Sequence, residues 1–368
     1  MFLGGKGRVA VAMSGGVDSS TAAALLKDEG YEVIGLTMHL WDQTQDGRGK
    51  FGRCCSPEDI HDARRVADQI GIPHYVINLK KAFAEEVVDY FVAEYLKGRT
   101  PNPCVLCNEK IKFDLLLRKA EELGAKALAT GHYARIELCP ANKKPRRYLL
   151  RRGKDRNKDQ SYFLFSMTQE QMSKVLFPLG EKSKAEVRQQ ASKLGLRVAK
   201  KAESQEICFV LDDDYRGFVE KRKGREISRP GEIVNREGKV LGFHRGLYSY
   251  TVGQRRGLGI AAPHPYYVLA LDAERNRVVA GKKEELIAHG LVASGVNWIS
   301  FPRLEGEVEA LVQIRYRHPG TPAILSPLDK ERVKVDFKIP LKSVTPGQAA
   351  VFYLGDEVLG GGWIERAF

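Results

Sequence analysis

A glycine-rich turn near the start of the chain carries the residue types most suited to chemistry. It runs from Ser14 to Ser19 and joins an apolar strand at residues 9–13 to a helix expected from Ser20 onward. Two glycines let the backbone turn tightly around an anion, and the N–H groups at a helix start attract phosphate. An ordinary turn with a Ser or Asp N-cap would use the same residues. The turn alone therefore predicts either a phosphate cradle or a capped helix.

The side chains of this turn favour one kind of phosphate chemistry. No lysine follows it until Lys27, whereas a Walker loop contains a lysine that reaches the terminal phosphates. The turn instead offers serine hydroxyls and the carboxylate of Asp18, which could hold Mg²⁺ against a pyrophosphate leaving group. Its pattern S-G-G-x-D-S resembles the PP-loop of ATP pyrophosphatases, which implies adenylation with release of pyrophosphate. The predicted ATP contacts in this loop are Ala12, Met13, Ser14, Gly15, Gly16, Val17, Asp18 and Ser19.

Cysteines supply the second candidate chemistry. Cys104 and Cys107 form a C-x-x-C pair after a rigid lead-in at residues 99–103, and Cys208 lies far downstream. We expect a helix to begin just after Cys107, where a thiol beside lysines has its thiolate favoured and is nucleophilic. Structural zinc is the alternative for the pair, but no second C-x-x-C or H-x₃₋₅-H completes four ligands. A lone Cys208 is equally compatible with a buried core position.

Length and composition limit the class of protein. A chain of 368 residues with 43% hydrophobic side chains predicts two or three domains with substantial cores. No stretch approaches eighteen consecutive apolar residues, and the start of the chain leaves no room for a signal peptide. We therefore expect no membrane partner and a cytoplasmic location. Six cysteines in such a protein fit reactive or metal-binding roles better than a disulfide framework.

The positive charge is concentrated in two places. The formal net charge is +13, and more than half of that excess lies in a basic run at residues 143–158. A shorter basic run occupies residues 221–225. Solvated loops are often basic, yet two such runs together favour a polyanionic partner, most simply nucleic acid bound through its phosphates.

The first part of the chain alternates strand and helix patterns. Repeated β-α units predict a parallel, doubly wound sheet that binds its ligand at the carboxyl ends of the strands. Ser14, Met38 and Gly131 all fall at such ends. The predicted strands are residues 9–13, 31–38, 74–79 and 127–130, and the predicted helices include residues 57–71 and 83–96.

The second part of the chain changes character from about Arg229. Capping boxes at Thr168 and Ser183 start the last short helices of the first part. Turn residues then separate Val-, Tyr- and Leu-rich runs, which is typical of hairpins, and the strands after about Ser294 suggest a small closed barrel. The predicted domains are a nucleotide-binding catalytic domain at residues 1–210, a central β-rich domain at 211–293 and a C-terminal β-barrel at 294–368.

The chain closely resembles the tRNA-specific 2-thiouridylases from residue 9 to residue 364. Many separate segments carry the resemblance in the right order, which makes it specific. They are residues 12–19, 54–56, 100–103, 106–108, 131–134, 158–161, 204–209 and 251–255. The resemblance implies an enzyme that forms 2-thiouridine at the wobble position of tRNA, with a PP-loop domain, a central domain and a C-terminal β-barrel.

The resemblance also assigns roles to single residues. It makes Cys208 the carrier of a persulfide received from an external donor, a cysteine desulfurase or sulfur-relay protein, and Cys107 its partner thiol. Met38 and Gly131 would contact ATP through their backbones. The residues that would face the target base are Asn102, Pro103 and Cys104. The residues that would contact tRNA are His132, Lys158, Asp159, Gln160, Arg315, Tyr316 and Gln348.

One departure from the family opens a different sulfur route. Many members carry Asp where this chain has Cys104, so this chain lacks that carboxylate. If Cys104, Cys107 and Cys208 converge, three thiolates could instead hold an iron–sulfur cluster with one iron left open for sulfide. Cys54 and Cys55 fit a structural role, and Cys139 has no evident one.

Two other classes of protein remain as alternatives. The first is another PP-loop ligase, which would need an ammonia source such as a glutaminase domain, and the chain contains none. The second is a non-catalytic tRNA-binding protein with a relic nucleotide site. The intact loop with both Cys107 and Cys208 argues against the second alternative.

Overall fold

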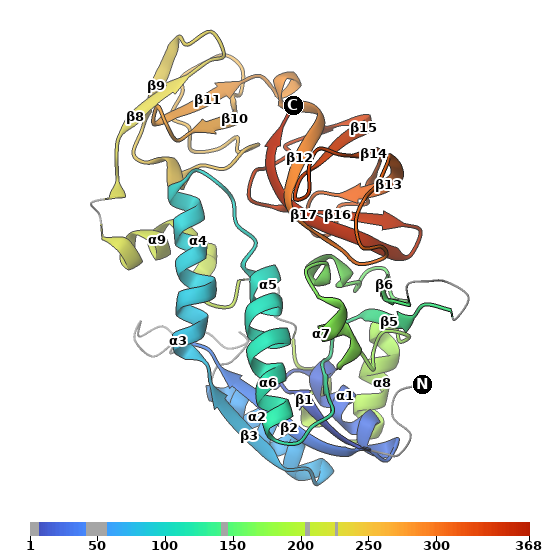
Figure 1. The fold of residues 1–368 in the computed structure, drawn as a ribbon. Coiled ribbons are helices and arrows are strands. Elements are labelled where there is room, and N and C mark those ends of the chain that lie inside the picture. Colours follow the sequence, from blue (N-terminus) through green and yellow to red (C-terminus); the bar gives the residue numbers. More distant parts are fainter. Residues whose placement is uncertain (1–6, 42–56, 141–145, 203–206, 225–226) are drawn as a thin grey trace. The chain divides into compact units, whose positions relative to one another are not determined.

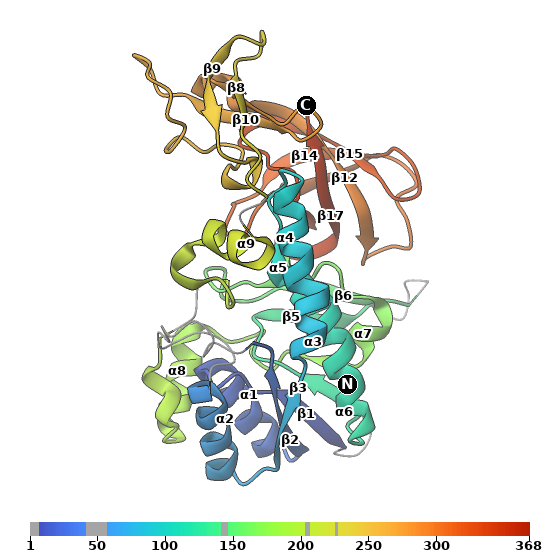
Figure 2. The same ribbon diagram turned by 90° about the vertical axis from the view of Figure 1, so that its left-hand side faces the viewer.

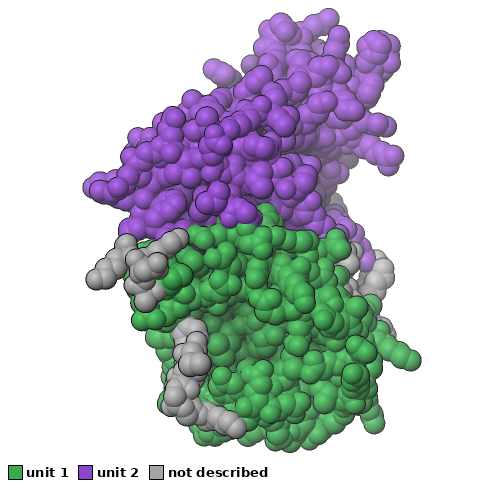
Figure 3. Space-filling view, turned by 90° about the vertical axis from the view of Figure 1, so that its right-hand side faces the viewer, with its two compact units in different colours: residues 1–87, 104–209, 356–358 green, residues 88–103, 210–355, 359–368 purple. Residues whose placement is uncertain are grey.

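The computed structural model describes residues 7–41, 57–140, 146–202, 207–224 and 227–368. The chain packs as two units, which Figure 3 shows in different colours. The first unit contains residues 1–87, 104–209 and 356–358, and the second contains residues 88–103, 210–355 and 359–368. The polypeptide therefore passes between the units several times. The three domains predicted along the sequence stay a prediction.

A five-stranded parallel sheet is the centre of the first unit (Figure 1). Its order is β3-β2-β1-β4-β7, so the strand order reverses beside β1. Open parallel sheets bind ligands at such a switch point, beyond the carboxyl ends of the strands. The strands are β1 Arg8–Ala12, β2 Glu32–His39, β3 His74–Asn78, β4 Ala127–Ala129 and β7 Val175–Leu176.

Helices cover both faces of this sheet, which confirms the doubly wound fold. Figure 2 shows α1 (Val17–Asp28), α2 (Pro57–Ile70) and α8 (Lys184–Lys193) on one side and α6 (Leu117–Glu122) on the other. Side chains alternate along a strand, so Val9 and Val11 of β1 enter the core cluster under α1, α2 and α8.

The remaining elements of the first unit follow several predicted signals. The capping boxes at Thr168 and Ser183 are present, each with reciprocal side-chain and backbone hydrogen bonds. Antiparallel β5 and β6 form a hairpin that carries part of the first basic run. These elements are β5 Ala134–Leu138, β6 Tyr148–Arg152, η4 Ser161–Leu164, α7 Gln169–Ser173 and η5 Arg197–Lys200.

The chain leaves and re-enters the first unit through two long helical runs. The first run comprises α3 Lys80–Phe83, the π-helical η2 Ala84–Val88 and α4 Asp89–Leu96. The second comprises α5 Pro103–Leu106, the π-helical η3 Cys107–Leu116 and α6. Segments of π-helix are rare and often mark functional sites, and η3 begins at a predicted catalytic cysteine.

The second unit contains two β structures. A four-stranded sheet has the order β10-β11-β8-β9, and six further strands form a barrel that closes where β12 pairs with β17. The predicted closed barrel is therefore confirmed. Helices α9 Tyr215–Lys223 and η8 Leu247–Ser249 precede most of these strands. The strands are β8 Gly231–Val234, β9 Val240–His244, β10 Tyr267–Asp272, β11 Arg277–Gly281, β12 Ile287–Trp298, β13 Val308–Gln313, β14 Thr321–Pro327, β15 Val333–Lys342, β16 Ala349–Leu354 and β17 Glu357–Ala367.

Candidate active site

The glycine-rich turn lies at the switch point of the sheet. It follows β1, and its backbone is folded by the hydroxyl of Ser19, which accepts from the Ser14 N–H at 3.1 Å and donates to the Gly16 carbonyl at 3.2 Å. The Ser14 and Ser19 hydroxyl oxygens are 3.3 Å apart. Serine side chains therefore hold the loop in shape from within. This loop occupies the position where a parallel sheet binds its ligand.

Helix α1 begins at this loop without a side-chain cap. It starts at Val17, earlier than the predicted start at Ser20, because Gly16 takes the N-cap position with extended backbone (φ −96°, ψ 165°). No side chain accepts a hydrogen bond there, so the capped helix that the sequence left open is not formed. The first N–H groups of a helix have no partner within the helix and attract anions. The start of α1 is therefore suited to a phosphate.

Two glycines bring other backbone segments close to the loop. Gly15 has φ +69°, and a Cβ atom there would collide with the Asp59 carbonyl. Gly131, just beyond β4, is equally confined, since its Cβ would lie 2.8 Å from the Ser19 nitrogen. The structure thus places Gly131 directly against the loop, while Met38 is buried at the end of β2. Their predicted backbone contacts with ATP stay predictions.

An ion pair at the loop was missed by the sequence analysis. Nζ of Lys184 lies 2.8 Å from both carboxylate oxygens of Asp18, and the Tyr133 hydroxyl donates to Oδ1 at 2.7 Å. The Lys184 side chain is 11% exposed. Lys184 is the first residue of α8, where the capping box at Ser183 fixes it. That capping box was visible in the sequence, but only the fold shows that it directs an ammonium group to the loop.

These contacts bear on the metals predicted at the site. The Asp18 carboxylate is already neutralised by Lys184 and hydrogen-bonded by Tyr133, so it does not fit a role as the predicted Mg²⁺ ligand. Within the described part of the chain, no three His, Cys, Asp or Glu side chains are grouped so that they could hold a metal ion. The predicted iron–sulfur site of Cys104, Cys107 and Cys208 therefore stays a prediction.

A second lysine braces the loop from outside. Nζ of Lys201 donates to the Gly15 carbonyl at 3.1 Å and to the carboxylates of Asp59 and Asp62, each at 2.6 Å. Burial lowers the pKa of Lys201, but the hydrogen bonds that its ammonium group donates to the two carboxylates outweigh it and raise the pKa overall. Asp59 is 4% exposed. Lys201 therefore links α2 to the glycine-rich turn at residues 14–19.

We expect Lys201→Met to lower the melting temperature by about 5 °C, because it leaves the buried Asp59 carboxylate without its cation. Thermal unfolding followed by circular dichroism measures this change. Lys200→Met is the matched control, since Lys200 is the exposed neighbour, and it should melt within about 1 °C of the unsubstituted protein. Equal melting temperatures for the two variants would contradict the bracing role.

The C-x-x-C pair lies on a helix, but not as predicted. The helix begins at Pro103, whose fixed φ and missing N–H suit the first helical position. Cys104 is therefore in the first turn and exposed, whereas Cys107 lies one turn later and is partly buried. The prediction that Cys107 lies at a helix N-terminus was wrong. Residues three apart share a helix face, so the two cysteines lie on the same side.

The other cysteines lie in different surroundings. Cys208 is partly buried, in a turn just before Phe209, which packs edge-on against Phe83 with ring centroids 5.6 Å apart. Cys139 is buried at the end of the β5–β6 hairpin. Cys54 and Cys55 lie outside the described residues. A sulfur role for Cys208 stays a prediction.

Several predicted tRNA contacts are engaged within the first unit. The Asp159 carboxylate accepts from Arg152, from the N–H groups of Gly153 and Ser161, and from the Ser161 hydroxyl, at 2.9–3.1 Å. The Gln160 side chain accepts from the Tyr133 N–H at 3.1 Å. These contacts fix the turn that presents Lys158. Asp159 and Gln160 thus have structural partners already.

His132 is buried rather than displayed on the surface. Its Nδ1 is 2.7 Å from the Thr130 hydroxyl, and its ring packs between Phe113 and Phe177. Burial, with a smaller contribution from the charge of Lys112, holds the pKa of His132 well below its usual value. The ring is therefore neutral at physiological pH. Its predicted contact with tRNA stays a prediction.

Gln348 supports the segment that precedes Cys104. Its amide donates to the Thr100 carbonyl at 3.0 Å and to the Pro101 carbonyl at 3.2 Å, and the Thr100 N–H donates to Pro346 at 2.9 Å. Asn102, next along the chain, is 8% exposed. Pro346 and Gln348, just before strand β16 of the barrel, thus hold the segment that leads into the predicted base-binding residues.

The remaining predicted tRNA residues and the basic runs are only partly available to a polyanion. Arg315 is exposed and Tyr316 half-buried in the turn after β13. In the first basic run, Arg151 pairs with Glu137 at 2.6 Å, and Arg152 and Arg156 pair with other carboxylates. Lys143, Lys144 and Arg225 lie outside the described residues. In the second run, Arg222 pairs with Asp89.

No helix in the described ranges is both long and apolar enough to cross a membrane. The phosphate loop at the switch point, the uncapped start of α1 and the close approach of Gly131 define a nucleotide-binding domain of the PP-loop, ATP-using class. Family matches cover the chain in three parts. They are "tRNA methyl transferase HUP domain" at residues 7–212, "tRNA methyl transferase PRC-barrel domain" at residues 216–282 and "Aminomethyltransferase beta-barrel domain" at residues 288–364.

Full-length relatives identify the family within this class. A tRNA-specific 2-thiouridylase MnmA from Geobacter metallireducens is 59% identical over 98% of this chain and 97% of the relative. One from Carboxydothermus hydrogenoformans is 51% identical over 98% of both. The chain belongs to the tRNA-specific 2-thiouridylase family of enzymes. Among solved structures, a 4-thiouridine synthetase–RNA complex with bound ATP is similar at 18% identity, with a TM-score of 0.36 over 56% of this chain and 46% of that one, too weak a likeness to bear on function.

Proposed function

We propose that this enzyme replaces the C2 oxygen of the wobble uridine in tRNA with sulfur, at the expense of ATP. The main support is the start of α1, which has no side-chain cap, lies at the switch point of the sheet and has Lys184 beside it. The chain also belongs to the 2-thiouridylase family. The phosphate-binding loop supports the ATP-dependent activation that this reaction needs. Membership of the family supports tRNA as the substrate.

Activation of the uracil is the first step. A carbonyl oxygen is a poor leaving group, so the C2 oxygen attacks the α-phosphorus of ATP, forming an O–P bond as pyrophosphate departs. The loop N–H groups at Gly16 and Val17 hold the phosphates, and their positive field stabilises the charge that develops on pyrophosphate. Lys184, which pairs with Asp18, places its ammonium group beside the same loop. The product is a uracil adenylate whose AMP leaves readily.

Sulfur transfer is the second step. The terminal sulfur of a Cys208 persulfide attacks C2, a C–S bond forms, and the C–O bond breaks with departure of AMP. The Cys107 thiolate then attacks the Cys208 sulfur, which releases 2-thiouridine and leaves a Cys107–Cys208 disulfide. A thiol reductant must return the disulfide to two thiols, and an external persulfide donor must reload Cys208.

The substrate must reach this chemistry as an unstacked base. Asn102, Pro103 and Cys104 are proposed to face the flipped uracil, and the position of this segment is supported by its hydrogen bonds with Gln348. Lys158, Arg315 and Tyr316 are proposed to contact the RNA. In this scheme Gln348 acts as a positioning residue, because its amide holds the segment and not the base.

The direct test is mass spectrometry of tRNA nucleosides after reaction with ATP and a persulfide-charged cysteine desulfurase. We expect 2-thiouridine in an amount that depends on ATP, together with tRNA-dependent release of pyrophosphate. Pyrophosphate release without any 2-thiouridine would instead indicate another PP-loop ligase. RNA binding with neither product would indicate a non-catalytic protein.

The same assay separates the two sulfur routes. The persulfide route predicts that colourless, aerobically purified protein is active with a persulfide donor. The cluster route predicts brown protein after anaerobic purification, with visible absorbance that Cys104→Ala removes. Activity found only in the brown form would overturn the persulfide assignment of Cys208.

A further inference from the structure

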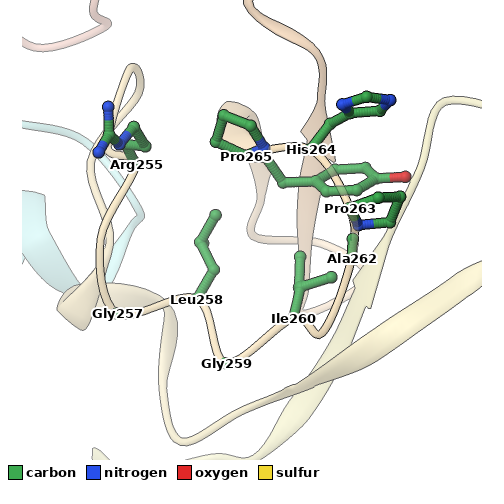
Figure 4. A pocket seen from close by; sticks show the side chains of 10 residues that line it. Arg255, Gly257, Leu258, Gly259, Ile260, Ala262, Pro263, His264 and Pro265 are labelled. Atoms are coloured by element: carbon green, nitrogen blue, oxygen red, sulfur yellow. The ribbon is translucent and has the colours of Figure 1, made fainter.

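A loop in the second unit lines a cavity that the proposed chemistry does not use. Residues 251–266 connect η8 to β10, and they begin with the segment Thr251–Arg255 that the sequence analysis identified without assigning it a role. The cavity has a volume of about 280 Å³. Figure 4 shows Arg255 on one side of it, His264 on the other, and Leu258, Ile260 and Pro265 between them.

Backbone and side-chain hydrogen bonds fix the start of this loop. Gly253 donates to the Val268 carbonyl at 2.8 Å, and Val268 donates to the Gln254 carbonyl at 2.9 Å. The Gln254 side chain accepts from the Thr251 N–H at 3.1 Å and donates to the Arg256 carbonyl at 2.9 Å. One glutamine therefore holds both sides of the turn that presents the two arginines.

Apolar anchors fix the middle and end of the loop. Leu258 is 6% exposed and belongs to the core of the four-stranded sheet, and Ile260 and Tyr266 pack against that core. Gly257 and Gly259 on either side of Leu258 have left-handed φ values of +78° and +66°. The cavity therefore belongs to a loop that is attached at several points.

The charge of this loop is unbalanced. Arg255 and Arg256 are exposed, and the described part of the chain shows no ion pair for either of them. Arginines of the adjacent strands and turns differ, since Arg275 pairs with Asp272 and Arg277 with Glu232. The sequence contains no Asp or Glu between Arg245 and Leu271. Two guanidinium groups thus face solvent with no carboxylate of their own segment to neutralise them.

The chemistry of this surface selects a phosphodiester ligand. Guanidinium groups bind phosphate with paired hydrogen bonds, and an aromatic ring such as that of the exposed His264, which lines the cavity, can stack on a base. A cavity of about 280 Å³ lies just below the range of about 300–1,000 Å³ typical of drug-sized ligands. It therefore suits one nucleotide of a longer chain better than a complete cofactor.

We propose that residues 251–266 form a second RNA contact, in which Arg255 and Arg256 bind backbone phosphates of tRNA and the cavity receives one nucleotide. The inference rests on the proposed function for the identity of the RNA as tRNA. It adds a binding surface on the four-stranded sheet to the residues that the family resemblance assigns. This contact contributes affinity and not chemistry.

The test is the salt dependence of tRNA binding by the double variant Arg255→Ala/Arg256→Ala. Each phosphate contact contributes close to one to the slope of log Kd against log salt, so removal of both arginines should reduce that slope by about 2 and weaken binding about tenfold or more near 0.15 M KCl. Fluorescence anisotropy of labelled tRNA measures both quantities. The double Arg→Lys variant keeps the charges and should keep the slope.

A matched control removes the same charge elsewhere in the second unit. Lys283→Ala/Lys330→Ala deletes two exposed cations outside the loop and should change the slope by less than the arginine pair does. An unchanged slope in the arginine variant, or an equal change in the control, overturns the proposal. If the double variant melts early, each single arginine variant should lower the slope by about 1.

Formation of 2-thiouridine by the unsubstituted enzyme, measured in parallel, separates this inference from the proposed function. Product with no slope difference refutes the RNA contact alone. A slope difference without any product refutes the proposed reaction but leaves the contact in place. When the rate is measured against tRNA concentration, the arginine variant should keep its kcat while its KM for tRNA rises about tenfold. The reason is that the loop binds tRNA and does not take part in the reaction.

Discussion

Replacement of Cys208 by alanine is expected to reduce 2-thiouridine formation by about a thousandfold or more, because the variant has no sulfur atom on which to carry the persulfide. Release of pyrophosphate that depends on tRNA should continue, since adenylation precedes the arrival of sulfur. Nucleoside mass spectrometry and a pyrophosphate assay on the same reaction measure the two steps separately.

Cys139→Ala is the control for the loss of a thiol as such. Cys139 is buried in the first unit at the end of a hairpin, and the proposed chemistry gives it no task. This variant should make 2-thiouridine at close to the unsubstituted rate. If Cys208→Ala forms as much 2-thiouridine as this control, the proposed persulfide role of Cys208 is wrong.

Lys184→Met is expected to lower tRNA-dependent pyrophosphate release by about a hundredfold to a thousandfold, the usual cost of losing one preorganised group that stabilises developing charge. The variant keeps the length of the side chain and removes its ammonium group. Affinity for tRNA should not change, because Lys184 is mostly buried beside the loop. Steady-state pyrophosphate assays and tRNA binding distinguish the two quantities.

A double-mutant cycle with Asp18 separates catalysis from structure. If Lys184 serves only to neutralise Asp18, then Asp18→Asn together with Lys184→Met should recover the rate, since no unpaired carboxylate remains. If the ammonium acts on phosphate, the double variant should stay as slow as Lys184→Met. Lys193→Met, at the exposed end of the same helix α8, is the matched control and should retain its activity.

The fold was largely predictable because its signals are local. Apolar runs bounded by glycine defined β1 and β4, and capping residues at Thr168 and Ser183 defined two helix starts. The start of α1 was placed three residues too late, because Gly16 as an N-cap carries no side-chain signal. The helix before Cys107 was missed for a related reason, since Pro103 was interpreted as part of an extended lead-in.

The site was predictable only where its residues adjoin in sequence. The loop at Ser14 could be identified from six residues, but the groups that contact it come from far along the chain. Lys184 and Lys201 each reach the loop from more than 160 residues away, and no periodicity connects such positions. Burial could not be predicted from the sequence either, and it makes His132 a buried, neutral residue.

The interleaving of the two units has a consequence for synthesis on the ribosome. Helix α4 stacks its Tyr95 on Tyr215 with centroids 4.5 Å apart, and Thr100 is held by residues 346–348. In the first unit, Leu150 of β6 pairs with Val358. Segments synthesised early therefore lack some of their native contacts until the last segments are synthesised. Neither unit can form all of these contacts until almost the whole polypeptide has emerged. An N-terminal fragment that retained the entire phosphate loop would still lack contacts on which its own fold depends.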